Sequence, residues 1–364
     1  MPSTRSEWIK SAPRTATSEK ANTPLFPFLV KLLHGEDLTP KEAAAFFRAM
    51  TSGESGSNQV AAALTALTAK GETAEELAGM ASVLKELATK IRAPKTAMDI
   101  VGTGSSAAKT FNVSTAAAIV AAGAGLTIAK QSNRGVTSKT GSADVLAELG
   151  VKIANDPTMA QTSLNTGVCF LSPPKFHPEM RRLADIRGRL GIRTCLNILG
   201  LLANPAGVSR HLIGVWHGTL VMPTAKALAL LKTDTAWVVH GEDGMDEVSL
   251  SGKTHVATVK NGEVRSYMVT PKDFGMNAGA TSHLNAATAK ESAVIIRDVL
   301  ASKRRDEARS LVVLNAATAL IIGGIAKDPM QAARLAEQSI DSGQAQNKLD
   351  RLVQFTNKKS SEPK

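Results

Sequence analysis

The sequence predicts an α/β protein: a small N-terminal helical domain, then a larger α/β domain with a mainly parallel central sheet flanked by helices. Apolar residues recur at helical spacing as far as residue 92. From Met98 onward, short apolar runs alternate with polar loops and helical segments, which is the pattern of strand–loop–helix units in a parallel sheet. The chain has 364 residues, 43% of them hydrophobic, so a sizeable core is expected.

The expected domain boundaries follow from these changes of pattern. We expect the helical domain over 24–95, with a contribution from about 190–217, and the α/β domain over 96–352. The two ends, 1–23 and 353–364, carry more Lys and Arg than Asp and Glu, and we expect them to be flexible basic tails.

Two helix starts in the N-terminal domain carry a clear sequence signal. Thr39-Pro-Lys-Glu42 is a capping box with Pro at the first helical position. Thr73 is followed three residues later by Glu76, which again caps a helix. The helix between these two starts is expected to end at Gly71.

The α/β domain is expected to alternate strands and helices. Strands are expected at Met98–Val101, Leu126–Ala129 and Trp237–His240, and helices at 115–124, 143–149, 285–301, 307–324 and 328–342. Residues 254–270 predict an antiparallel hairpin that turns at Asn261-Gly262, because this dipeptide adopts the positive φ angles of a two-residue turn.

The composition limits the class of partner and the compartment. The net charge of +11 favours anionic partners, either phosphorylated metabolites or nucleic acid. Aromatic residues make up only 4%, fewer than a protein that stacks on single-stranded nucleic acid usually carries. Cys169 and Cys195 have neither zinc nor redox spacing, so we expect reduced thiols in a cytoplasmic protein. No apolar run reaches membrane-spanning length, so no membrane association is expected.

The first candidate ligand loop, Gly102-Thr-Gly-Ser-Ser-Ala107, follows the first expected strand. Its glycines let backbone N–H groups approach an anion, although the Gly-Lys-Ser/Thr ending of a P-loop is absent. Asn112-Val-Ser-Thr115 then opens a helix, where free amides and hydroxyls suit a phosphate or its Mg²⁺ complex. A Ser/Thr helix cap beside an ordinary turn explains the same residues.

The second candidate loop, Lys130-Gln-Ser-Asn-Arg-Gly135, also follows an apolar strand. Ligands of α/β sheets bind at such carboxyl ends of strands. Lys130 supplies a compact charge for phosphate and Asn133 an amide that orients a substrate, while Lys139 and Ser142 add ligands for an anion. The alternative is a solvated basic loop.

The third candidate loop, Gly241–Glu247, brings four carboxylates to the end of a strand. Asp246 and Glu247 are adjacent acids, and opposite phosphate-binding loops they predict Mg²⁺ held jointly with a diphosphate. The alternative is a solvated acidic turn. Together the three loops predict a cation-rich diphosphate cradle opposite a carboxylate Mg²⁺ site, which is what cleavage of a C–O bond to pyrophosphate needs.

The order of short motifs resembles the anthranilate phosphoribosyltransferase family over about residues 24 to 352. The motifs are Asp99–Gly104, Asn112–Thr115, Asn133–Gly135, Lys139–Asp144, Phe176–Pro178, Leu190–Thr194, Asn197–Gly200, Asn204-Pro205, Val239–Gly241 and Gly244–Glu247. The resemblance implies the fold of class II nucleoside phosphorylases and transfer of a phosphoribosyl group from phosphoribosyl pyrophosphate to anthranilate in tryptophan biosynthesis. It also implies two Mg²⁺ ions and a homodimer formed through the helical domain.

The resemblance assigns roles to particular residues. Phosphoribosyl pyrophosphate is expected on Gly102, Gly104, Ser105, Ser106, Thr110, Asn112, Ser114, Thr115, Lys130, Lys139 and Ser142. The Mg²⁺ ions are expected on Ser114, Asp246 and Glu247, and the aromatic acceptor on Asn133, His177 and Arg187. Lys130 and Arg187 are the expected catalytic residues, with Arg187 pairing with the acceptor's carboxylate. The alternative for Arg187 is a surface helix arginine among its neighbours Arg181, Arg182 and Arg189.

Three ligand segments depart from the usual pattern of this family. Ser105-Ser-Ala107 replaces Gly-Asp-Gly, Gln131-Ser132 replaces His-Gly, and Leu201 replaces the Pro that normally follows Gly200. Because the Mg²⁺ acids are intact, this pattern predicts a retained donor with altered affinity, and a changed acceptor is a further alternative.

Two alternatives to anthranilate transfer stay open. One is a phosphoribosyltransferase for a different aromatic amine or a nucleoside phosphorylase, because Lys130-Gln-Ser132 resembles the Lys-x-Ser pattern of the phosphorylases. The other is a catalytically silent homologue that binds nucleic acid through a basic face. The net charge favours that second alternative, whereas the retained Asp246 and Glu247 argue against it.

Overall fold

The computed structural model describes residues 23–104, 110–133 and 141–358. Almost all of the expected N-terminal tail lies outside these residues, as do Ser105, Ser106 and Lys139. Within the described ranges, none of the helices is both long enough and apolar enough to cross a membrane.

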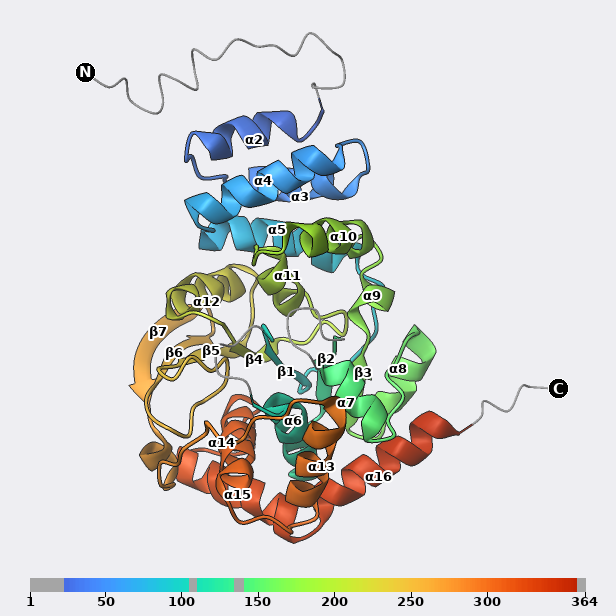
Figure 1. The fold of residues 1–364 in the computed structure, drawn as a ribbon, viewed down its shortest axis with the longest axis vertical. Coiled ribbons are helices and arrows are strands. Elements are labelled where there is room, and N and C mark those ends of the chain that lie inside the picture. Colours follow the sequence, from blue (N-terminus) through green and yellow to red (C-terminus); the bar gives the residue numbers. More distant parts are fainter. Residues whose placement is uncertain (1–22, 105–109, 134–140, 359–364) are drawn as a thin grey trace, which may run out of the picture.

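Four helices form the N-terminal part of the molecule: α2 (Phe26–Leu33), α3 (Pro40–Thr51), α4 (Ser57–Lys70) and α5 (Ala74–Leu87) (Figure 1). The predicted capping boxes at Thr39 and Thr73 are both present. Gly71 ends α4 with a φ of 92°, a conformation that glycine adopts without steric cost. Two later helices, α10 (Met180–Leu190) and α11 (Leu196–Leu202), pack on this group.

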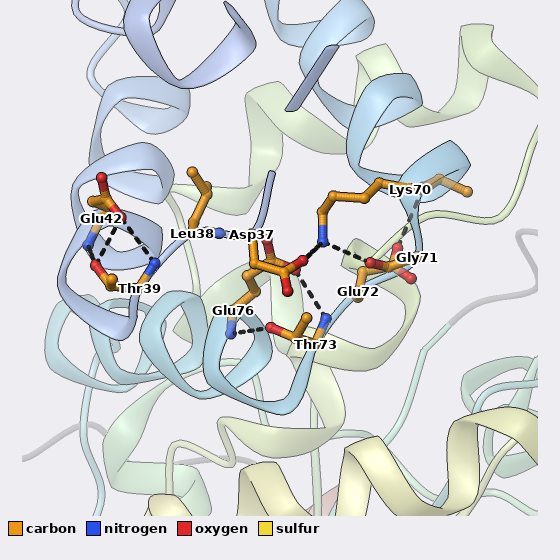
Figure 2. Close-up of polar contacts among 10 residues, drawn as sticks. Asp37, Leu38, Thr39, Glu42, Lys70, Gly71, Glu72, Thr73 and Glu76 are labelled. Carbon is orange, nitrogen blue, oxygen red and sulfur yellow. Dashed lines mark hydrogen bonds and ion pairs between the residues drawn. The ribbon is translucent and has the colours of Figure 1, made fainter. Parts of the chain in front are cut away.

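A buried polar cluster fixes how α4 and α5 meet the loop before α3 (Figure 2). The fully buried Glu76 accepts the backbone N–H groups of Leu38 and Thr73, both at 2.9 Å, and the Nζ of Lys70 at 3.0 Å. Lys70 Nζ also donates to Asp37 Oδ1 at 2.6 Å and to the carbonyl of the next residue at 2.8 Å. Each of the three ammonium protons therefore has an acceptor, and two ion pairs of Lys70 connect α4 to α5 and to the loop before α3.

A seven-stranded sheet in the order β3-β2-β1-β4-β5-β6-β7 forms the centre of the larger domain. Its strands are β1 (Met98–Gly102), β2 (Ile128–Gln131), β3 (Val168–Leu171), β4 (Arg210–Gly214), β5 (Thr235–Gly241), β6 (Thr254–Lys260) and β7 (Glu263–Val269). β1 to β5 pair in parallel, while β6 and β7 are antiparallel. This order confirms the predicted mainly parallel sheet, and Asn261 and Gly262 form the predicted hairpin turn with positive φ angles.

Helices cover both faces of the sheet. One face packs against α6 (Val113–Gly123), α7 (Ser142–Glu148), α13 (Ala289–Leu300), α14 (Glu307–Ile322), α15 (Pro329–Asp341) and α16 (Gln344–Asn357). The other face packs against α12 (Val221–Leu230) and the N-terminal helices, and near β3 against α8 (Pro157–Leu164) and α9 (Pro173–Phe176). Strand side chains alternate between these layers: Leu212 lies in the core with α6, and Ile213 in the core with α5.

Three features differ from the expectation. Helix α16 continues to Asn357 and buries Leu352 and Thr356, so the predicted tail from residue 353 begins too early. Within 190–217, α11 packs on α5 as expected, but β4 lies in the middle of the sheet. The sequence patterns also did not predict β3, β4, helices α8 to α12 or helix α16. Short apolar runs fit a strand and a buried helix equally well.

Candidate active site

Asp246 joins the third candidate loop to the first, at the carboxyl ends of β1 and β4. Its Oδ2 atom accepts hydrogen bonds from Thr103 Oγ1 at 3.0 Å and from the Gly104 N–H at 2.9 Å. A Cβ atom on Gly214 would lie 1.6 Å from the Asp246 carbonyl oxygen, and one on Gly102 would lie 2.9 Å from Asp246 Oδ2. Glycine at both strand ends therefore allows the acidic loop to lie directly on the sheet.

Glu247 joins the same acidic loop to the start of α6. Its carboxylate accepts the Ser114 N–H, which is one of the free amides in the first turn of that helix. Burial and then the neighbouring Asp246 carboxylate raise the pKa of Glu247 to about 8, against the opposing effects of Lys130 and the Ser114 N–H. A cation placed beside these two carboxylates would relieve their repulsion.

Lys130, in β2, lies beside both acids. Its side chain is only 2% exposed, and Nζ donates to the Ile100 carbonyl and, at 3.2 Å, to Ser114 Oγ. Burial lowers the pKa of Lys130, and the charges of three nearby carboxylates oppose that shift. Because this ammonium is buried and held by fixed partners, the solvated-loop alternative does not apply to Lys130.

The amides in the first turn of α6 are bonded within the protein: the Ser114 N–H donates to Glu247, the Val113 N–H to the Phe111 carbonyl at 2.8 Å, and the Thr115 N–H to the Asn112 carbonyl at 3.2 Å. The side chain of Asn112, at the cap position, is turned toward α13: its Oδ1 accepts from Ser292 Oγ at 3.0 Å, and its N–H donates to the same hydroxyl at 2.9 Å. Thr115 Oγ1 is buried and has no hydrogen-bond partner among the residues that the structure describes. The hydroxyls of Thr110 and Ser142 donate to the carbonyls of Phe111 and Asn133 at 3.1 and 3.4 Å.

The expected acceptor residues come from other elements. Arg187, in the last turn of α10, is half-buried, and its guanidinium has no hydrogen bond or ion pair with any other residue that the structure describes. Burial lowers the pKa of Arg187. His177 is buried, with its ring nitrogens 2.8 Å from the Ala203 carbonyl and 3.2 Å from Glu179 Oε1. Asn133 is exposed. The roles of these three residues toward an acceptor stay predictions.

A buried network beneath the site was missed by the sequence reasoning. Asn204 Nδ2 donates to Asp99 Oδ2 at 2.7 Å and to the Ala129 carbonyl at 2.8 Å. The Gln131 N–H donates to Asp99 Oδ1 at 3.3 Å, and its Nε2 to the Gly200 carbonyl at 2.7 Å. Burial raises the pKa of Asp99 to about 6 despite these donors and the nearby lysine. Asp99 and Asn204 both stand in recognised motifs, but only the strand order shows that they meet.

The candidate metal ligands are few. Among the residues that the structure describes, no group of three or more His, Cys, Asp or Glu side chains is placed to hold a metal ion. Asp246, Glu247 and the Ser114 hydroxyl supply only oxygen donors, and a substrate or water must complete the shell. This donor set fits Mg²⁺, which binds through one or two carboxylates together with phosphate oxygens.

Comparisons with known proteins agree with this geometry. Residues 26–88 match the helical bundle domain of a glycosyl transferase family, and residues 94–346 match the a/b domain of that family. The anthranilate phosphoribosyltransferase of Methylobacterium nodulans is 41% identical over 91% of this chain and 98% of its own length. That of Nitrobacter hamburgensis is 40% identical over 90% and 97%.

Solved structures give the same result. The anthranilate phosphoribosyltransferase of Thermus thermophilus superposes with a TM-score of 0.84 at 34% identity, over 90% of this chain and 99% of that one. The enzyme of Saccharomyces cerevisiae in complex with PRPP and Mg gives a TM-score of 0.83 at 28% identity, over 93% and 98%. The protein is thus a glycosyltransferase built from a helical bundle and an a/b domain. More narrowly, the chain belongs to the anthranilate phosphoribosyltransferase family.

Proposed function

We propose that this protein transfers the phosphoribosyl group of phosphoribosyl pyrophosphate to anthranilate, giving N-(5-phosphoribosyl)anthranilate and pyrophosphate in tryptophan biosynthesis. The observation that carries the proposal is the convergence of Lys130, Ser114, Asp246 and Glu247 at one edge of the sheet. A buried ammonium, the positive end of a helix dipole and two adjacent carboxylates suit a diphosphate that is bound with Mg²⁺. Relatives that are about 40% identical over nine tenths of the chain carry this name.

The chain's own groups supply charge and position. Asp246, Glu247 and Ser114 would hold Mg²⁺, for which we propose two ions, and the metal would supply positive charge against the leaving pyrophosphate. Lys130 holds a fixed positive charge beside them, which is worth more in a buried site than in water. The acceptor nitrogen attacks C1 of the ribose as the C–O bond to pyrophosphate breaks, so the configuration inverts. The reaction needs no covalent enzyme intermediate, because orientation and electrostatics lower the barrier.

Arg187 supports an acceptor that carries a carboxylate. Its half-buried guanidinium presents several N–H donors that have no acceptor in the described protein. A carboxylate pairs with such a fork through two parallel hydrogen bonds. The yeast relative has been solved in complex with 4-fluoroanthranilate, and Asn133 would orient the amine of such an acceptor.

A different aromatic amine is the second candidate acceptor. The amide of Gln131, which stands where the family usually has His, is engaged by the carbonyl of Gly200. The acceptor side therefore differs from the usual pattern, whereas the donor side keeps the two Mg²⁺ acids and the lysine. Binding of nucleic acid is not favoured, because these retained groups form one site. We also propose a homodimer in the cytoplasm, as the family resemblance implies.

The direct test is consumption of anthranilate, followed by its fluorescence, with phosphoribosyl pyrophosphate and Mg²⁺. We expect Mg²⁺-dependent loss of anthranilate with release of one pyrophosphate for each anthranilate consumed. The same assay with other aminobenzoates, and with nucleosides plus phosphate, separates the alternatives. Turnover only on one of those substrates would replace anthranilate in the proposal, and a salt-dependent DNA shift with no turnover would favour the binding protein.

A further inference from the structure

We propose that the hydroxyl of Ser132 is a ligand for a phosphate group of the donor substrate, at a position where the family usually has glycine. The inference rests on the proposed function, since it assigns one further donor ligand to the same site. It is carried by the burial of Ser132, by the face of β2 on which it lies, and by the groups around it.

Ser132 is buried, and its hydroxyl has no partner among the described residues. The residue is 2% exposed, and Oγ makes no hydrogen bond with residues 23–104, 110–133 or 141–358. Its backbone is fixed, because the N–H donates to the Leu171 carbonyl of β3 at 2.9 Å. A buried hydroxyl without a partner is unfavourable, and a group from outside the chain would satisfy it.

The alternation of side chains along β2 places this hydroxyl on the α6 face. Ile128 packs in the core with α6, and Lys130 reaches Ser114 on the same helix. Gln131 lies on the opposite face, where it binds the Gly200 carbonyl of α11. Ser132 continues the ladder to β3 and therefore returns to the side of Lys130, one position nearer the carboxyl end of the strand.

The surroundings on that face suit a phosphate. Lys130 contributes an ammonium, and its bond to Ser114 places it beside the positive end of the α6 helix dipole. Thr115, next to Ser114, has a second buried hydroxyl that no residue in the described part of the chain hydrogen-bonds. Asp246 and Glu247 also face Lys130, so the anion would bind with the metal that these acids hold. Hydroxyls and an ammonium are the usual ligands of a phosphate oxygen.

The residue expected to pair with the acceptor's carboxylate lies elsewhere, and Asn133, next to Ser132, alternates to the opposite face of the strand. Arg187 is carried by α10, which packs on α3 and α4 on the opposite side of the sheet. Loss of the Ser132 hydroxyl is therefore expected to weaken binding of the donor substrate and to leave binding of the acceptor unchanged.

The test uses calorimetry of phosphoribosyl pyrophosphate with Mg²⁺ on the full chain. Ser132→Ala and Ser132→Gly both remove the hydroxyl, and the second restores the usual residue of the family. Each is expected to bind the donor about tenfold more weakly, the loss typical of a hydrogen bond to a charged group. Ser163→Ala is the control, because Ser163 is equally buried but its hydroxyl donates to a carbonyl within α8 at 2.7 Å. We expect its donor affinity to match the wild type.

The outcomes separate this inference from the proposed function. If the wild type takes up no donor, the proposed function itself fails. If both Ser132 variants bind the donor as tightly as the wild type does, the inference is overturned. The hydroxyl then hydrogen-bonds only to ordered water. A raised KM for the acceptor with unchanged donor affinity also overturns it, because the hydroxyl then faces the acceptor. Thermal melting of each variant confirms that the weaker binding is measured on folded protein.

Discussion

At the scale of single residues, the two expected catalytic cations differ in burial and in hydrogen bonding. Lys130 is buried and already donates to two protein oxygens, so its position is set before any ligand arrives. Arg187 is half-buried and, within the described residues, has no partner, so it keeps its hydrogen-bonding capacity for a ligand. Fixed charge suits the stabilisation of a leaving group, whereas a free planar guanidinium suits recognition of a carboxylate.

Arg187→Lys tests the second of these roles. Lysine keeps the charge but loses the paired donors, so we expect the KM for anthranilate to rise about tenfold or more, with donor affinity unchanged. Arg189→Lys is the matched control, because Arg189 is exposed and pairs with Asp185 one turn earlier. Equal acceptor KM values for Arg187→Lys and the wild type would remove Arg187 from the acceptor site.

The raised pKa of the Asp99 carboxyl group predicts that the free energy of unfolding depends on pH. Its native pKa of about 6 lies above the value of about 3.9 expected in the unfolded chain. The native state therefore holds the proton more tightly, and the stability of the wild type falls as pH rises from about 4 to about 6. Relative to Asp99→Asn, the wild type should lose about 3 kcal/mol over this range. Urea unfolding of both proteins at several pH values measures the difference, and a difference independent of pH would contradict the assignment.

At the scale of elements, the acidic loop depends on a missing side chain at the end of β4. The Asp246 carbonyl lies where a Cβ of residue 214 would be, so Gly214→Ala must displace the loop that carries the metal ligands. We expect a loss of about 3 kcal/mol or more in unfolding free energy, together with loss of activity. Gly252→Ala is the control, because nothing lies within 4 Å of its added Cβ. Normal stability and activity of Gly214→Ala would show that the loop adapts.

The ion pair between α4 and α5 makes a second prediction at this scale. Glu76→Ala removes one of the two carboxylates that pair with the buried Lys70 ammonium, and it removes the acceptor of the Leu38 and Thr73 N–H groups. The side chains of Glu76 and Lys70 are 0% and 7% exposed. Removal of one member of a buried pair costs about 3 kcal/mol, which urea unfolding measures. Glu263→Ala in the exposed pair with Arg265 is the control and should change the unfolding free energy little. If the two variants lose similar amounts of unfolding free energy, the buried pair does not stabilise the helical domain more than an exposed pair does.

The elements also show what a sequence can and cannot predict. The helix starts at Thr39 and Thr73 and the turn at Asn261 were predictable, because cap and turn geometry depends on residues within a few positions of one another. The contact between Asp99 and Asn204 was not, because it joins residues 105 positions apart that only the strand order brings together. The motifs located the candidate ligand loops, but they did not show which side chains between these loops are buried or which of those lack a partner among the described residues.

At the scale of the whole molecule, the helical and α/β parts share one hydrophobic core. Phe46 and Leu84 of the N-terminal helices lie in the same cluster as Leu199 of α11, Val101 of β1 and Ile213 of β4. Helix α10, which carries the proposed acceptor residue Arg187, is therefore packed in the same core as the strands that end at the proposed metal ligands. The proposed donor and acceptor halves of the site are built on one continuous framework, as a reaction that depends on positioning requires.

The most direct test of this account is the turnover of Asp246→Asn with Glu247→Gln, measured by anthranilate fluorescence over a Mg²⁺ titration. These changes keep the shape of both side chains and remove the charges that would hold the metal beside Lys130. We predict Mg²⁺-dependent turnover for the wild type and none for the double variant at any Mg²⁺ concentration. Turnover of the double variant at the wild-type rate would contradict the assignment of the metal site on which the account depends.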